Sequence, residues 1–192
     1  QYPVIRDRAR AEGAEIHWAD ETGLRSDDVR GRSYAPVGKT PEIRIRRRRE
    51  GLSIISSITN RGKVRFKVFE GAMKAPLLID FMRRLVRESQ KEGAPKVFLI
   101  LDNLKVHHAR QVQAWLQDNK EHIEVFYLPS YSPELNPNEL LNANLKAAIT
   151  TQAPARRKGQ LKEAAIGHLR HLQKSPKKVQ QFFGKDSVKY AA

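Results

Sequence analysis

The segment KVFLILDN (residues 96–103) decides which fold the sequence predicts. It is an unbroken apolar run up to Asp102. A strand without polar alternation is typical of the interior of a sheet that is covered on both faces. The segments on either side, residues 75–93 and 109–119, carry apolar residues at helical spacing, and residues 123–129 predict another strand. Strands that alternate with helices favour parallel pairing.

The N-terminal part of the chain predicts an antiparallel extension of this sheet. AEIHWAD (residues 14–20) has the alternation of a strand. LSIISSIT (residues 52–59) and KVRFKVF (residues 63–69) flank the turn NRG and predict a hairpin. In the second of these segments apolar residues alternate with Arg65 and Lys67. We therefore expect one face of the hairpin in the core and a basic face toward solvent.

The C-terminal part predicts helices. YSPELNPNELLNANLK (residues 131–146) opens with turn residues and continues at helical spacing, with Asn136 as the N-cap and Pro137 at the first helical position. Two more helices are expected in residues 160–173 and 175–184. The fold class is therefore α/β, with a mixed five-stranded sheet flanked by helices and a helical C-terminal end.

The charge balance favours a polyanionic partner. The 192 residues include 36 Lys and Arg against 21 Asp and Glu, a formal net charge of +15. Basic residues cluster in RIRRRRE (residues 44–50) and in residues 145–178, where Glu163 is the single acid. Such clusters suit the phosphate backbone of a nucleic acid, and a generally basic surface is the alternative. There is no cysteine, which excludes disulfides and thiolate metal sites.

Three acids are candidates for a metal site. Asp20 and Asp102 each end a predicted strand, and sites in such sheets form at the C-terminal ends of strands. Glu139 lies in the first turn of a predicted helix. Three neighbouring carboxylates repel one another unless a cation neutralises them, and hard divalent cations prefer oxygen ligands. The alternatives are turn or cap roles for the aspartates and a capping box between Asn136 and Glu139.

Three blocks, in this order, carry a resemblance to a known family. WADETG (residues 18–23), LILDNLKVHHA (residues 99–109) and LPSYSPELNPNELLNANLK (residues 128–146) resemble the catalytic domain of mariner-like insertion-sequence transposases of the DDE type. The 36 residues between Asp102 and Glu139 are close to the spacing typical of that family. The resemblance implies a ribonuclease H-like fold. It also implies that the catalytic residues and metal ligands are Asp20, Asp102 and Glu139.

The resemblance also implies the reaction and its partners. The expected function is metal-dependent cleavage of phosphodiester bonds at transposon ends and strand transfer into target DNA, with Mg²⁺ or Mn²⁺, two ions, as the cofactor. The expected partner is double-stranded DNA, bound by a homodimer, with no membrane involved and a location in the bacterial cytosol or nucleoid. The alternatives are a ribonuclease H-like nuclease that only hydrolyses DNA and a non-catalytic DNA-binding remnant.

The sequence departs from the family pattern in two respects. Family members usually carry an N-terminal helix-turn-helix region that binds DNA, and residues 1–192 contain none. We therefore expect a single catalytic domain that is either a fragment or a partial copy. Asn138 and Asn144 stand where relatives often have Asp, and a neutral residue beside Glu139 is expected to weaken metal binding.

Basic residues near these blocks are expected to contact DNA. Lys146 lies seven residues beyond Glu139, on about the same helical face. The alternatives are a solvated surface for the arginines and the lysine, and a polar helix start for the histidines. The expected DNA-binding residues are Arg44, Arg46, Arg47, Arg48, Arg49, His107, His108 and Lys146.

Overall fold

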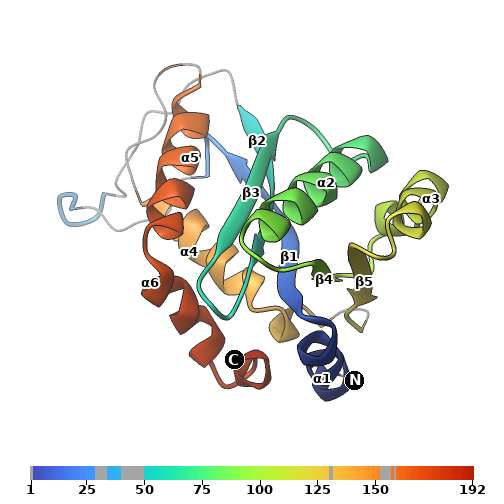
Figure 1. Ribbon diagram of the computed structural model, residues 1–192. Helices are drawn as coiled ribbons and strands as arrows, with labels where there is room; N and C mark the ends of the chain where they lie inside the picture. Colours follow the sequence, from blue (N-terminus) through green and yellow to red (C-terminus); the bar gives the residue numbers. More distant parts are fainter. Residues whose placement is uncertain (1, 29–33, 40–49, 130–131, 152–156, 158) are drawn as a thin grey trace.

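A five-stranded mixed sheet of order β3-β2-β1-β4-β5 forms the centre of the molecule (Figure 1). The computed structural model describes residues 2–28, 34–39, 50–129, 132–151, 157 and 159–192. β1 pairs with β2 antiparallel and with β4 parallel, while β2–β3 is an antiparallel hairpin and β4–β5 a parallel pair. The strands are β1 (Ala14–Arg25), β2 (Gly51–Ile58), β3 (Val64–Phe69), β4 (Lys96–Leu101) and β5 (Ile123–Tyr127).

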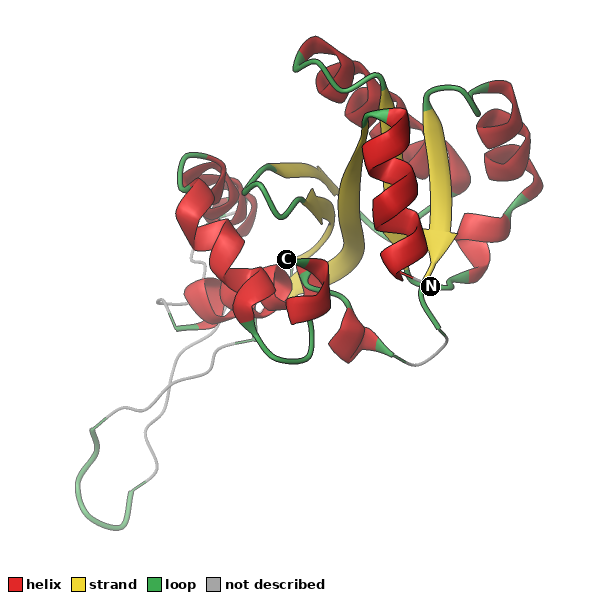
Figure 2. Ribbon diagram, turned by 60° about the horizontal axis from the view of Figure 1, so that its bottom comes forward, coloured by secondary structure: helices red, strands yellow, loops and turns green. Residues whose placement is uncertain are grey.

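Helices cover both faces of the sheet, with α2 and α3 on one face and α4, α5 and α6 on the other (Figures 1 and 2). Short 3₁₀ turns join several of these elements. Among the described residues, no helix has both the length and the apolar character needed to cross a lipid bilayer. The helices are α1 (Tyr2–Glu12), α2 (Ala75–Lys91), α3 (Arg110–Asp118), α4 (Asn138–Thr150), α5 (Gln160–Gln173) and α6 (Pro176–Gln181). The 3₁₀ turns are η1 (Lys105–His108), η2 (Pro133–Leu135), η3 (Phe182–Gly184) and η4 (Lys189–Ala191).

The core has one apolar cluster on each face of the sheet. Trp18 and Ile100 belong to the cluster beneath α4, α5 and α6, and Val97 and Leu99 belong to the cluster beneath α2. Successive residues of a strand point to opposite faces, so β4 contributes to both clusters. This explains why its sequence is apolar without interruption. The expectation of a mixed five-stranded sheet flanked by helices is confirmed.

The expected basic solvent face of the hairpin is wrong. Arg65 and Lys67 lie beneath α2, where acids meet them: Arg65 Nε is 2.8 Å from Glu88 Oε2, and Lys67 pairs with Asp80. Period-two alternation separates the two faces of a strand, but it does not say which element covers the second face. The two cations are therefore engaged within the protein.

β1 also extends further than expected. Asp20 does not end the strand, because residues 21–25 continue the antiparallel ladder with β2. The parallel ladder with β4 stops earlier, at the pair Trp18–Ile100. Asp20 therefore lies just beyond the end of the parallel pairing, on a strand that β2 still holds.

Candidate active site

The structure brings all three predicted acids to one pocket. Asp20, Asp102 and Glu139 line a cavity of about 360 Å³. Asp20 comes from β1 just beyond the end of its pairing with β4, and Asp102 directly follows the last residue of β4. Glu139 comes from the first turn of α4. Segments that are far apart in the chain thus meet where the parallel strands end, as such sheets favour.

The position of Glu139 bears on the capping-box alternative. A capping box requires the Glu139 side chain to accept the backbone N–H of Asn136. That N–H instead donates to Pro133 O at 2.9 Å. The N-cap of α4 is Pro137, one residue later than expected, and Asn136 Oδ1 accepts the N–H of Asn138, the first helical residue, at 3.0 Å. The Glu139 side chain lines the pocket from the first turn of α4.

The electrostatics of the pocket are those of crowded carboxylates. Asp20 is 8% exposed. Burial is the largest cause that raises its pKa, and the Glu139 and Asp102 carboxylates raise it further, to about 7. Burial also raises the pKa of Asp102, against the effect of the neighbouring His107. A cation in the pocket would relieve this repulsion.

His107 contacts both the backbone and the side chain of Asp102. Its ring is 4% exposed, and its Nδ1 lies 2.8 Å from Asp102 O and 3.3 Å from Asp102 Oδ1. Both oxygens are acceptors, so Nδ1 carries the proton and donates to them. Burial lowers the pKa of His107. The ring is enclosed and engaged with Asp102, and the contact of His107 with DNA stays a prediction.

Three asparagines, Asn136 just before α4 and Asn138 and Asn142 on it, bond to β1, and their partners could not be predicted from local patterns. Asn138 Nδ2 donates to Trp18 O at 2.9 Å, and Asn136 Nδ2 donates to Ala19 O at 3.0 Å. Each amide supplies a donor to a backbone carbonyl of β1 close to the end of the parallel ladder with β4. Buried carbonyls need such partners.

Asn142 attaches the same helix to the third successive residue of β1. Its Nδ2 donates to Asp20 Oδ2 at 2.7 Å, and this bond lowers the pKa of Asp20 against the larger effect of burial. Asn142 is 1% exposed, and its Oδ1 is a buried atom without a hydrogen-bond partner among the described residues. The available signal was a polar residue three positions after Glu139, beside the apolar stripe of the helix.

Asn138 and Asn144, which stand where relatives often have Asp, do not line the pocket. The Asn138 amide is fully buried and also donates to Ser56 O at 2.7 Å, while its Oδ1 accepts from Ser56 Oγ. Asn144 Oδ1 lies 2.9 Å from His168 Nε2 on α5. Neither side chain lines the carboxylate pocket. Asn138 therefore has no direct contact with the carboxylate pocket through which it could weaken metal binding.

The donors of the pocket fit a hard divalent cation in their chemistry. Three carboxylates supply only oxygen, which Mg²⁺ and Mn²⁺ prefer. The negative charges of Glu139 and Asp102 contribute, after burial, to the raised pKa of Asp20. Over the described ranges, no three His, Cys, Asp or Glu side chains are grouped closely enough to coordinate an ion as they stand. The acids thus share a pocket without being drawn together to ligand distances.

The remaining predicted DNA contacts are distributed unevenly. Arg44, Arg46, Arg47, Arg48 and Arg49 lie outside the described residues. His108 is exposed, with Nε2 2.5 Å from Asn103 Oδ1 and its ring 4.4 Å from that of Tyr127. Lys146 is exposed on α4. His108 and Lys146 remain predictions.

Comparison with known proteins identifies the family of this fold and pocket. The family model described as "DDE superfamily endonuclease" matches residues 15–162, a span that contains all three acids. The chain belongs to this superfamily. Along 74 residues it is 36% identical to the insertion element IS630 uncharacterized 39 kDa protein of Shigella sonnei, covering 38% of the present chain and 21% of that protein.

Solved structures with a similar fold include those of Mos1 transposase. The chain matches a Mos1 transposase paired-end complex with a TM-score of 0.67 at 19% identity, over 98% of this chain and 60% of the transposase. It matches the catalytic domain of Mos1 mariner transposase with a TM-score of 0.62 at 17% identity, over 97% and 88% of the two chains. The expected ribonuclease H-like fold and the resemblance to mariner-like DDE transposases are thereby confirmed. The present chain spans about 60% of the length of the complete transposase.

Proposed function

We propose that this DDE superfamily domain is the catalytic domain of a transposase, which cleaves DNA at transposon ends and joins the ends to target DNA. The observation that carries the proposal is the meeting of Asp20, Asp102 and Glu139 in one pocket, within the span of the family match. Solved complexes of Mos1 with similar folds include a strand transfer complex. The net charge of +15 supports double-stranded DNA as the partner.

The three acids are proposed as the ligands of Mg²⁺ or Mn²⁺. Mos1 paired-end complexes with each of these metals support this choice. When bound, two divalent ions would activate the attacking oxygen and stabilise the leaving oxygen of the phosphodiester. Asp20 and Asp102 would share the ions, and Glu139 would complete one of the two sites. A homodimer on paired DNA ends remains part of this proposal.

The surrounding residues have positioning roles in this proposal. Asn142 holds Oδ2 of Asp20 through its amide, and the backbone of Glu21 also bonds to this carboxylate. His107 holds Asp102 through Nδ1. Ligand orientation of this kind by outer hydrogen bonds affects metal affinity strongly.

The test is nicking of supercoiled DNA in Mn²⁺ or Mg²⁺ by wild type and by Asp102→Asn. We expect the variant to lose at least about 100-fold in rate, since a ligand and its charge are removed. Asp118→Asn on α3 is the matched control, because Asp118 is exposed and outside the pocket. Undiminished nicking by Asp102→Asn would exclude the assigned site.

Product analysis separates the remaining alternatives. Strand-transfer products support a transposase, whereas cut ends alone indicate a nuclease that only hydrolyses DNA. A DNA-binding remnant would bind with a strong salt dependence and show no cleavage that requires a divalent ion.

A further inference from the structure

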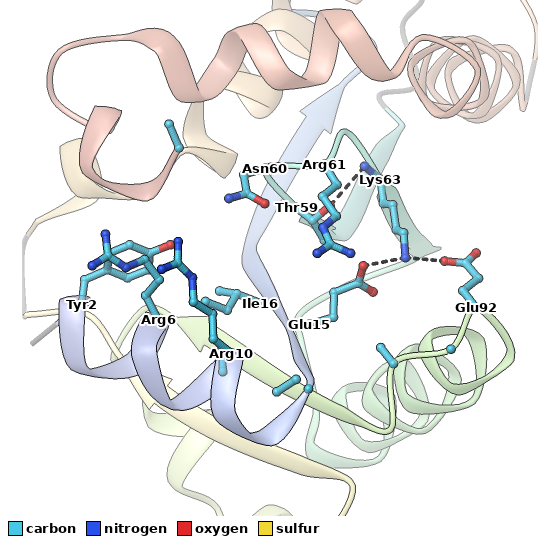
Figure 3. A pocket seen from close by; sticks show the side chains of 16 residues that line it. Tyr2, Arg6, Arg10, Glu15, Ile16, Thr59, Asn60, Arg61, Lys63 and Glu92 are labelled. Carbon is cyan, nitrogen blue, oxygen red and sulfur yellow. Dashed lines mark hydrogen bonds and ion pairs between the residues drawn. The ribbon is translucent and has the colours of Figure 1, made fainter.

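A second pocket lies at the start of β1, at the opposite end of the parallel β1–β4 ladder from the three acids. It encloses about 490 Å³ and is lined by α1, the start of β1, the β2–β3 turn, the α2–β4 connection and Ala192 (Figure 3). Glu15 lines this pocket, and Asp20 lines the carboxylate pocket. Asp20 lies five positions after Glu15 along the strand, which corresponds to roughly 17 Å. The two pockets are therefore distinct sites of one sheet.

The acids of this second pocket are already neutralised by the protein. Lys63 Nζ lies 2.5 Å from Glu15 Oε1 and 2.7 Å from Glu92 Oε2, as the dashed lines in Figure 3 mark. His17 Nε2 is 3.0 Å from the other oxygen of Glu15, and Arg65 also pairs with Glu92. These carboxylates and Lys63 satisfy one another, so they leave little net charge for a ligand.

The arginines of the pocket are not balanced in this way. Arg6 and Arg10 rise from successive turns of α1, and Arg61 projects from the β2–β3 turn into the same space (Figure 3). Arg6 lies 3.2 Å from its neighbour Asp7. In the part of the chain that the structure describes, Arg10 and Arg61 make no ion pair. The pocket therefore presents two uncompensated guanidinium groups and a third that is only weakly paired.

The backbone that carries Arg61 is fixed in place. Gly62 has a φ of +87°, and a Cβ at this position would lie 2.5 Å from Pro176 O at the start of α6. The turn is closed by bonds from Thr59 N to Lys63 O at 3.1 Å and from Gly62 N to Thr59 O at 2.9 Å. Because the turn is already ordered, less conformational entropy is lost when Arg61 contacts a ligand.

We propose that this pocket, defined by Arg6, Arg10 and Arg61, binds the phosphate backbone of DNA at a second contact, away from the bond that is cleaved. A planar guanidinium donates two parallel hydrogen bonds to a phosphate group, and arginines on two different elements can hold neighbouring phosphates. The inference rests on the proposed function, because it assumes that DNA is the partner. It adds a contact that contributes to binding and leaves the chemical step unchanged.

The test is the salt dependence of DNA binding by the full chain. A labelled duplex is titrated in EDTA at several KCl concentrations with wild type and with Arg10→Ala/Arg61→Ala. Removing two phosphate contacts is expected to reduce the slope of log K against log [KCl] by about 2. Arg83→Ala/Arg87→Ala removes two exposed arginines of α2 outside the pocket, and we expect it to keep the wild-type slope. Thermal unfolding of each variant verifies that it is folded.

The outcomes separate this inference from the proposed function. If wild type binds and nicks DNA but Arg10→Ala/Arg61→Ala shows the wild-type slope, the second contact is wrong and the proposed function stands. If wild type does not bind DNA, both fail. Inorganic pyrophosphate serves as a second probe. If it stabilises wild type but not the double variant while the DNA slopes coincide, the pocket holds small anions and the DNA assignment is overturned.

Discussion

At the scale of single residues, Asp20 combines burial with two acidic neighbours. Burial, and then Glu139 and Asp102, raise its pKa from 3.8 to about 7. A carboxyl with a raised pKa keeps its proton in the folded protein at pH values where the unfolded chain has released it. Its contribution to stability is therefore complete below about pH 4 and is lost as the pH rises toward 7.

This linkage predicts the behaviour of Asp20→Asn. Asn cannot ionise, and its side-chain oxygen can still accept the bond from Asn142. In EDTA, we expect the Tm of the variant minus that of wild type to grow between about pH 4 and pH 7 and then to level off. Calorimetry over this range measures the difference. A difference that does not change with pH would contradict the assigned environment of Asp20.

Asn142→Leu tests how Asp20 is held. The substitution keeps the branching and the number of side-chain heavy atoms but removes the donor 2.7 Å from Asp20 Oδ2. We expect the Mn²⁺ concentration for half-maximal nicking to rise roughly 10–100-fold, and the Mn²⁺-induced gain in Tm to require correspondingly more metal. Asn144→Leu is the matched control, since Asn144 contacts His168 instead. Equal metal dependence in the two variants would show that Asn142 has no role in positioning Asp20 for the metal.

At the scale of elements, the contact between α4 and β1 builds the carboxylate pocket. The helix and its start were predictable, because Asn136 and Pro137 are local signals of an N-terminus. The amide bond from Asn142 to Asp20 was not, since it joins residues that are 122 positions apart. Local patterns determine where an element begins, whereas side-chain partners depend on which elements the fold brings together.

The β2–β3 turn gives a prediction at the same scale. In Gly62→Ala the new Cβ would meet Pro176 O and the backbone would keep a positive φ. We expect the free energy of unfolding to fall by about 1–3 kcal/mol or more. Gly71→Ala is the control, because Gly71 has a φ of +78° with no atom within 4 Å of a built Cβ. Urea unfolding of both variants isolates the steric part, and equal losses would show that Pro176 does not constrain the turn.

At the scale of the whole molecule, two pockets of different charge lie at opposite ends of the parallel β1–β4 ladder. The three acids line a pocket beyond the end of β4, and arginines line a pocket at the start of β1. The three acids could be predicted from their sequence blocks, and the net charge of +15 predicted a polyanionic partner. The second pocket could not, because Arg10 and Arg61 become neighbours only when α1 and the hairpin pack at the same end of β1.

The central claim is that Asp20, Asp102 and Glu139 together bind a divalent cation. Titration calorimetry of Mn²⁺ into wild type and Glu139→Gln tests it most directly, because it requires neither DNA nor catalysis. Glu134→Gln, an exposed glutamate of η2 outside the pocket, is the control. We expect Glu139→Gln to bind Mn²⁺ at least about 10-fold more weakly than wild type and Glu134→Gln to bind as wild type does. Equal affinity of wild type and Glu139→Gln would contradict the claim.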